Sequence, residues 1–164
     1  MITPEQKIRN ESDALTWRNT CRRDGRQLVV TNGCFDLLHP GHVHYLTQAK
    51  ALGDVLIVGL NSDASVAAIK GPQRPINNQD FRSRLLVALK PVDAVVIFDE
   101  TTPMAIIGAI KPAIHVKGGD YTPESLPEYD TVVSNGGRVE CLSFINGYST
   151  STIIQKIIRQ APEG

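Results

Sequence analysis

The stretch that decides the fold is LVVTNGCFDLLHPGH, residues 28–42. It begins within a short apolar segment, residues 27–31, that has the length and composition of a buried strand. Pro40 then suits the first turn of a helix, and apolar residues recur with helical spacing until Gly53. A buried strand that leads directly into a helix is the first unit of an alternating α/β fold.

The same alternation continues to the end of the chain. Because the later apolar runs are continuously Val, Ile and Leu, they indicate parallel strands that are covered on both faces. The expected fold is one doubly wound α/β domain with a parallel five-stranded sheet and helices on both faces. The predicted strands are residues 27–31, 54–60, 94–98, 113–116 and 139–142, and the predicted helices are residues 40–52, 61–69, 79–89 and 103–110.

Two further helices are expected at the ends of the chain. Residues 1–25 are predicted to form a helical extension, with Ser12 as its cap and Gly25 as its stop. Residues 26–164 then form the main domain. The final helix is expected to start near Ser149 and to carry its isoleucines on one face.

Composition excludes several classes of protein. The chain has 164 residues, of which 41% are hydrophobic and 21% charged, as in a globular domain and not in a disordered chain. Lys and Arg together number 17, as do Asp and Glu, so the net charge is zero. A neutral protein has no general attraction to nucleic acid or to an acidic membrane. Any anion site must therefore be built locally.

Cysteine usage and the N-terminus indicate a cytoplasmic protein. The chain contains three cysteines, Cys21, Cys34 and Cys141, without a Cys-x-x-Cys pair. This pattern argues against a disulfide framework and fits a reducing compartment. No apolar signal segment is visible at the start, and the longest apolar runs are far too short to span a bilayer. We expect no membrane partner.

The segment after the first strand holds a candidate anion site. In doubly wound sheets, ligands bind beyond the carboxyl ends of the strands. His39 and His42 flank a helix start, where free backbone N–H groups and the helix dipole favour negative charge. Gly33 and Gly41 allow a ligand to approach the backbone closely. The stretch therefore predicts a phosphate site with two imidazole donors.

The histidines of this segment also fit a zinc site or a plain helix start. His39, His42 and His44 could bind zinc together with Cys34, or they could be surface histidines around a helix cap. The complete string after a buried strand favours the phosphate site. It is neither a Walker loop nor a G-x-G-x-x-G motif, so kinase and dehydrogenase functions lose their main support.

Four segments carry a resemblance to a known family. Residues 31–42 (TNGCFDLLHPGH) resemble the signature of the cytidylyltransferase-like nucleotidyltransferase superfamily. Residues 61–77 (NSDASVAAIKGPQRPIN), 116–124 (VKGGDYTPE) and 147–154 (GYSTSTII) are similar to the heptose 1-phosphate adenylyltransferase domain of bacterial ADP-heptose synthesis. The resemblance extends over residues 25–160.

The resemblance implies an activity and its components. AMP would pass from ATP to D-glycero-β-D-manno-heptose 1-phosphate, giving ADP-heptose and pyrophosphate for lipopolysaccharide core synthesis. It implies nucleotide-associated Mg²⁺ with no protein metal site. The resembling domain often occurs fused to a sugar kinase; for this chain we expect a separate upstream sugar kinase, and we expect a homodimer. The implied catalytic residues are His39 and His42; nucleotide-binding residues are Asn32, Gly33, Cys34, Phe35, Gly41, Lys70, Arg74, Ser149, Thr150 and Ser151; sugar-phosphate-binding residues are Asp36, Lys117, Gly118 and Asp120.

Residue chemistry alone leaves some of these roles open. The hydroxyls from Ser149 to Thr152 could bind phosphate or simply cap the last helix. Lys70 and Arg74 could clamp phosphates or be solvated loop charges. Lys117 and Asp120 could bind a sugar phosphate or belong to a Gly-Gly-Asp turn. Asp36 fits a structural role as well as a substrate contact. Arg82 on the following helix fits a surface charge.

The substrates also have alternatives. The same fold and reaction would serve CTP with glycerol phosphate or an aminoalcohol phosphate. A nucleotide-binding regulatory module without turnover is a third hypothesis, although a pure binder could do without both imidazoles.

Overall fold

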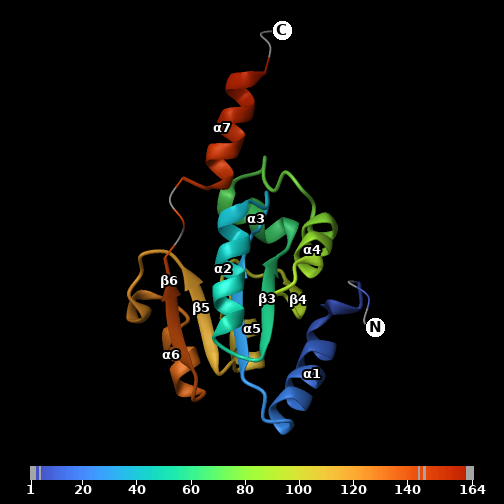
Figure 1. Cartoon of the computed structure of the whole chain (residues 1–164), viewed down its shortest axis with the longest axis vertical. Helices are drawn as coiled ribbons and strands as arrows, with labels where there is room; N and C mark the ends of the chain where they lie inside the picture. Colours follow the sequence, from blue (N-terminus) through green and yellow to red (C-terminus); the bar gives the residue numbers. More distant parts are fainter. Residues whose placement is uncertain (1–2, 4, 144, 146, 162–164) are drawn as a thin grey trace.

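All strands of the computed structural model lie parallel in one sheet, with helices on both faces (Figure 1). The structure describes residues 3, 5–143, 145 and 147–161. The strands are β1 (Ile8–Arg9), β2 (Leu28–Gly33), β3 (Val55–Asn61), β4 (Ala94–Phe98), β5 (Ile114–Gly118) and β6 (Arg138–Leu142). The helices are α1 (Glu11–Arg23), α2 (Pro40–Ala51), α3 (Asp63–Lys70), α4 (Gln79–Ala88), α5 (Met104–Ile110), α6 (Tyr129–Ser134) and α7 (Thr150–Gln160), with 3₁₀ turns η1 (Glu5–Lys7) and η2 (Pro123–Ser125).

The doubly wound parallel sheet is confirmed, but the predicted number of strands is wrong. The sheet has six strands, because β1 pairs with Val95 and Val96 of β4. A two-residue strand is too short to produce a periodic signal. Ser12 is not the helix cap; the side chain of Asn10 caps α1 by accepting a 2.8 Å bond from the Asp13 amide. Helix α6 was missed, because it has only six residues.

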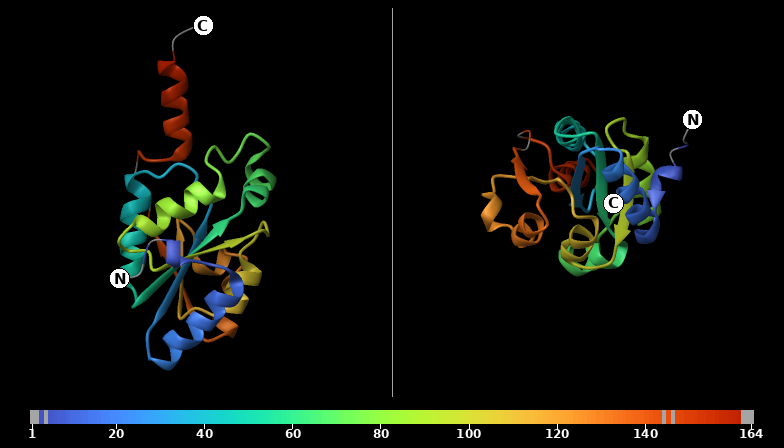
Figure 2. Two further views of the ribbon diagram at one scale, coloured as in Figure 1. Left: turned by 90° about the vertical axis from the view of Figure 1, so that its right-hand side faces the viewer. Right: turned by 90° about the horizontal axis from the view of Figure 1, so that it is seen from below.

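Alternate residues of the strands point to two separate cores. One core contains Leu28, Val30 and Ile57 under helices α1, α5 and α6. The other contains Val29 and Leu56 under α2 and α4. Because both faces are covered, every residue of β3 is buried. Figure 2 shows the helices on either side of the sheet.

Strand order creates a crevice beside β2. The order is β1-β4-β3-β2-β5-β6, so the chain first proceeds from β2 through β3 to β4 and then returns to the other side of β2. At such a switch point the connections after the two neighbouring strands diverge and leave a binding crevice. Here the crevice lies beyond the carboxyl ends of β2 and β5.

Helix α7 stands away from the sheet (Figure 1 and the left view of Figure 2). The side chain of Ser149 caps it by accepting a bond from the Thr152 amide. None of its residues is buried, and Ile157 and Ile158 are 60% and 67% exposed. The predicted start of the helix is confirmed. In the described part of the chain, no helix is long and apolar enough to cross a membrane.

A close backbone approach before β6 gives a stability prediction. A methyl group at Gly137 would collide with the carbonyl oxygen of Pro112, whereas one at Gly108 would meet only the Thr131 methyl at 3.6 Å. Gly137→Ala should lower the free energy of unfolding by about 1–3 kcal/mol. Gly108→Ala, inside α5, should raise it by about 0.5–1 kcal/mol. Urea denaturation measures both, and equal effects of the two substitutions would contradict this packing.

Candidate active site

A cleft opens at the switch point between β2 and β5. Its empty volume, part of which is open to solvent, is about 580 Å³. Apart from Tyr45, every residue that lines it is among the site residues predicted from the sequence. The lining residues are Asn32, Gly33, Cys34, Phe35, Asp36, His42, Tyr45, Lys70, Arg74, Lys117, Gly118 and Thr150.

The two histidines form a stacked pair at the start of α2. Their ring centroids lie 3.8 Å apart with an interplanar angle of 22°. His39 is the N-cap residue of the helix, and its side chain makes no capping bond. The Nδ1 atoms of both rings are buried and have no hydrogen-bond partner among the described residues. Because buried polar atoms are normally paired, two unpartnered nitrogens at one helix start set this pair apart from ordinary packed histidines.

Two glycines make room for the rings of His39 and Phe35 beside the histidine pair. A Cβ atom at Gly41 would lie 3.0 Å from Nδ1 of His39, and one at Gly33 would lie 3.0 Å from the Phe35 ring. Phe35 itself has a left-handed backbone with φ 45° and packs its ring 5.2 Å from that of His42. Gly33 and Gly41 therefore allow the rings to pack tightly. Gly33 also lines the cleft, whereas Gly41 is buried.

Burial keeps the histidines neutral in the ligand-free protein. The pKa of His42 falls from 6.5 to about 4, first because burial disfavours the charged ring and then because His39 and Lys70 repel it. Burial also lowers the pKa of His39. Each neutral imidazole can donate one hydrogen bond, and the approach of an anion would favour its protonated form.

The carboxylate of Asp36, in the loop after β2 (residues 34–39), binds the loop after α3 (residues 71–78), which is called the basic loop below. It accepts a 2.7 Å bond from Nε of Arg74 and further bonds from the amides of Ile76 and Asn77. Burial by itself raises the pKa of Asp36, but the amide bonds and the Arg74 guanidinium outweigh it, and the pKa is lowered. Nη2 of Arg74 has no hydrogen-bond partner in the described part of the chain. This ion pair therefore brings Arg74 to the cleft.

Arg82 is buried and links several segments of the chain by hydrogen bonds; it is not a surface charge. Its side chain is fully buried and donates hydrogen bonds to the carbonyl oxygens of Cys34, Asn61 and Asn77. It also pairs with Asp63 at 2.7 Å. The helical pattern of residues 79–89 could not show this, because burial of an arginine depends on carbonyl groups distant in sequence. Arg82 thereby fixes the loop that holds the predicted site.

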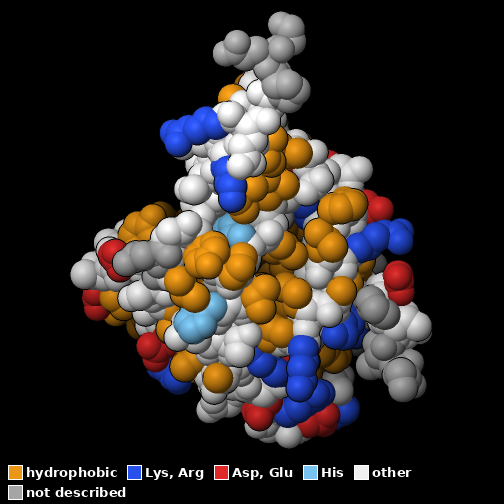
Figure 3. Space-filling model, turned by 45° about the horizontal axis from the view of Figure 1, so that its top comes forward, with side chains coloured by type: hydrophobic (Ala, Val, Ile, Leu, Met, Phe, Trp, Pro, Cys, Tyr) orange, Lys and Arg blue, Asp and Glu red, His pale blue; other side chains and the backbone are white. Residues whose placement is uncertain are grey.

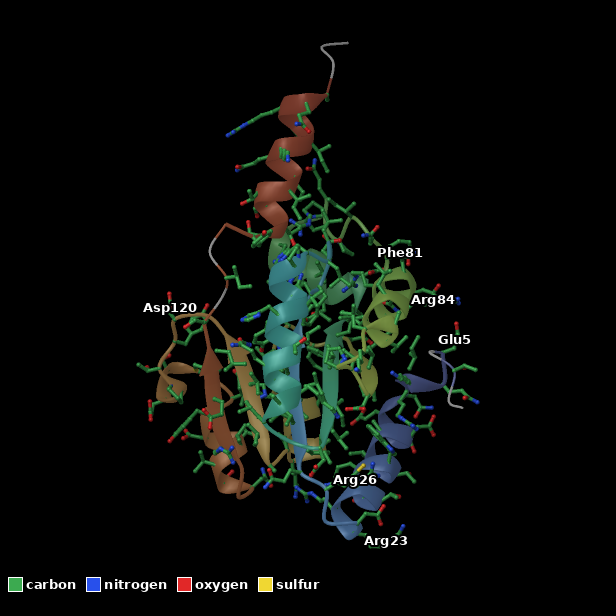
Figure 4. The ribbon with its side chains drawn as sticks, in the orientation of Figure 1. Glu5, Arg23, Arg26, Phe81, Arg84 and Asp120 are labelled. Carbon is green, nitrogen blue, oxygen red and sulfur yellow. The ribbon has the colours of Figure 1, made fainter. Side chains whose placement is uncertain are left out.

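Some predicted site residues do not line the cleft. His39 stacks on the ring of His42, which does line the cleft, and Gly41 packs against the His39 ring. Ser149 uses its side chain to cap α7, and Ser151 is exposed, whereas Thr150 reaches the cleft. Asp120 is exposed and points outward from the β5–β6 side of the molecule (Figure 4).

Sequence reasoning missed three residues beside the cleft. Tyr45 lines it, with its hydroxyl 2.6 Å from that of Thr31. His115 and Glu128 form a buried pair next to Lys117. The sequence pattern gave little indication that His115 and Glu128 lie at a site, because His115 is within an apolar strand and Glu128 is at the start of the unpredicted helix α6.

The outer surface above the cleft combines apolar and basic groups. Figure 3 shows histidine side chains surrounded by hydrophobic ones below the C-terminal helix, with Lys and Arg side chains on that helix. Within the described residues, no group of three or more His, Cys, Asp or Glu side chains is placed to hold a metal ion.

Comparison with known proteins assigns the family. The family model for cytidylyltransferase-like proteins matches residues 30–156, from β2 into α7. The chain belongs to this cytidylyltransferase-like family. The match includes both histidines, the basic loop and Lys117.

Curated relatives are considerably longer than this chain. It is 56% identical to the bifunctional protein HldE of Trichlorobacter lovleyi over 139 residues, which are 85% of this chain and 28% of that protein. It is 48% identical to the bifunctional protein HldE of Pelobacter propionicus over 156 residues, 95% of this chain and 32% of that protein. This cytidylyltransferase-like chain thus spans about three tenths of the length of these relatives.

Solved structures share the fold. A lipopolysaccharide core biosynthesis protein from Thermoplasma volcanium has a TM-score of 0.59 and 30% identity, and the match covers 76% of this chain and 100% of that one. A pantoate-beta-alanine ligase from Francisella tularensis has a TM-score of 0.57 and 13% identity, covering 94% of this chain and 79% of that one. The second likeness is one of fold alone.

The low pKa of His42 predicts a pH effect on the stability of this cytidylyltransferase-like protein. Between its ordinary pKa of 6.5 and its folded pKa of about 4, the unfolded chain binds a proton that the folded chain does not. The stabilisation is therefore complete above about pH 6.5 and is lost as pH falls toward 4. From pH 7 to pH 5 we expect the wild type to lose on the order of 1–2 kcal/mol through this group.

Urea denaturation of His42→Gln at the two pH values tests this linkage. The variant should lack that part of the pH dependence. His44→Gln, at an exposed position on the same helix, is the matched control and should follow the wild type. An identical decline in all three proteins would refute the linkage to His42.

Proposed function

We propose that this chain is an adenylyltransferase that transfers AMP from ATP to D-glycero-β-D-manno-heptose 1-phosphate. The observation that carries the reaction type is the stacked pair of His39 and His42, with buried and unpartnered nitrogens at a helix start beside a cleft. Such a pair supplies hydrogen bonds where charge develops on a phosphate. The products are ADP-heptose, used in lipopolysaccharide core synthesis, and pyrophosphate.

The chemical step is an in-line displacement. A phosphate oxygen of the sugar forms a bond to the α-phosphorus of ATP, while the bond from that phosphorus to the oxygen bridging to the β-phosphorus breaks. The electron pair leaves with pyrophosphate, and no side chain becomes covalently modified. Catalysis then depends on alignment and on stabilisation of charge. His39 and His42 would donate to oxygens of the α-phosphate.

Basic groups on the two sides of the cleft fit the two substrates. Lys70 and Arg74 lie on the side of β3 and α3, and Lys117 lies on β5, on the opposite side of β2. We assign Lys70, Arg74 and the start of α7 to the β- and γ-phosphates of ATP. Lys117 and Gly118 are assigned to the sugar phosphate, with Asp120 as an outer contact for sugar hydroxyls.

Asp36 serves this site by positioning Arg74. Its carboxylate is held by Arg74 and two backbone amides, and its side chain is 1% exposed. For the same reason it is poorly suited to bind Mg²⁺. We therefore propose that Mg²⁺ arrives with ATP as part of the substrate, held by phosphates and water.

The identity of the acceptor rests on resemblance. The segments at residues 61–77, 116–124 and 147–154 resemble ADP-heptose synthesis enzymes, and one solved relative is a lipopolysaccharide core biosynthesis protein. A cytoplasmic location, a homodimer and an upstream kinase activity that supplies the sugar phosphate complete the proposal. These three parts do not depend on the geometry of the cleft.

Pyrophosphate release with a panel of substrates tests the proposed reaction. We expect ATP with heptose 1-phosphate to react fastest among pairings of ATP or CTP with heptose 1-phosphate or glycerol phosphate. Faster turnover of CTP with glycerol phosphate would refute the substrates but keep the reaction type. Nucleotide binding without pyrophosphate release from any pairing would point to a regulatory module.

Replacement of His42 tests the catalytic assignment. Removing a donor to the developing charge typically lowers turnover by on the order of 100-fold or more, so His42→Ala should show a loss of this size. The dissociation constant for ATP should change much less, because ground-state contacts with Lys70 and Arg74 remain. His44→Ala is the control for a change on the same helix. Turnover of His42→Ala within a few-fold of the control would exclude a catalytic role.

A further inference from the structure

A buried ionic cluster lies next to the cleft and outside the proposed chemistry. Glu128, at the N-cap of α6, is 1% exposed. Its Oε1 accepts a 3.1 Å bond from Nζ of Lys117 and lies 3.1 Å from Nε2 of His115. Beside an ionised carboxylate, this imidazole nitrogen carries the proton and donates it. One buried carboxylate oxygen thus holds two side chains of β5.

The cluster follows from the geometry of β5. His115 and Lys117 are two residues apart and therefore point to the same face of the sheet, the face that α6 covers. Ile114 and Val116 point to the other core. The start of α6 places Glu128 over His115 and Lys117.

Lys117 also spans the switch point. Its Nζ lies 3.3 Å from Oδ1 of Asn32, at the end of β2. An ammonium group has three N–H donors, of which Glu128 and Asn32 occupy two. Among the described residues the third N–H has no partner and can serve a ligand, and the lysine side chain is 25% exposed and lines the cleft. A flexible lysine is in this way fixed in one orientation.

The charge state of Glu128 suits this arrangement. Burial by itself raises the pKa of Glu128, but the His115 bond and the Lys117 charge outweigh it and bring the pKa to about 2. The carboxylate is therefore ionised at neutral pH. A buried charge is costly unless it is paired, and here Lys117 and His115 supply the pairing.

We propose that Glu128 is a positioning residue that fixes the ammonium of Lys117 for the phosphate of the acceptor. The inference rests on the proposed function, since it takes the acceptor to be a sugar phosphate. Lys117 lies on β5, across β2 from Lys70 and Arg74, and so lines the side of the cleft that is left for the acceptor. His115 holds the carboxylate from the buried side.

Steady-state kinetics of Glu128→Gln test this role. The variant should raise the KM for the sugar phosphate about tenfold, as expected for one misplaced charge-assisted bond, and leave the KM for ATP within about twofold. Glu124→Gln removes a charge from the same connection at an exposed position and serves as the control. Equal KM values for the sugar phosphate in the two variants would overturn the proposal.

A double-mutant cycle separates positioning from a general structural role. If Glu128 acts through Lys117, Glu128→Gln should have no further effect on kcat/KM in a Lys117→Met background. Effects of the two substitutions that multiply would instead show that Glu128 acts independently of Lys117, which contradicts the proposal.

Glu128→Asp keeps the buried charge and withdraws the carboxylate by one methylene group. Because this variant keeps the buried charge, it can be measured even if Glu128→Gln does not fold. Thermal unfolding of each variant shows whether it is folded. The aspartate variant should also raise the KM for the sugar phosphate selectively, and an unchanged value would count against positioning. Should the wild type use another acceptor in the substrate panel, the same cycle is measured with that acceptor, so failure of the proposed substrate is distinguished from failure of this inference.

Discussion

The carboxylate of Asp36 is the constraint on which the site depends. It binds the Arg74 guanidinium and two amides of the same loop, and so joins the segment after β2 to the segment after α3. Arg82 also joins these two segments, because it donates hydrogen bonds to the carbonyl oxygens of Cys34 and Asn77. Without these bonds, the histidines and the basic loop would belong to two independent surface loops. The bonds bring His42 and the basic loop together at one cleft.

This arrangement explains how a protein without net charge can form an anion site. Lys70, Arg74 and Lys117 line one cleft, although they come from a helix end, a loop and a strand. Asp36 and Glu128, the acidic partners of Arg74 and Lys117, are buried and accept bonds from the protein. The carboxylates therefore orient the cations and expose little negative charge to a ligand. Local geometry replaces the long-range field of a basic protein.

The sequence predicted the elements that have periodic patterns. Continuous apolar runs identified β2 to β6, and glycine, proline and histidine after β2 identified the helix start at the switch point. The two-residue strand β1 and the short helix α6 lack enough residues for a pattern. The roles of Arg82 and Glu128 depend on partners far along the chain, such as the carbonyl oxygen of Cys34 for Arg82. Sequence spacing carries no information about such contacts, so from the sequence Arg82 fitted a surface charge and its role stayed open.

The contact between Lys117 and Asn32 has a consequence for the order of folding. These residues are 85 positions apart, and the contact forms only when β5 has returned to pair with β2. Pairing of distant strands is slow, because loop entropy is lost before the contacts form. A chain that has folded only through β4 has one wall of the cleft and no site. A ligand that touches both strand ends therefore binds the completed fold alone and shifts the folding equilibrium toward it.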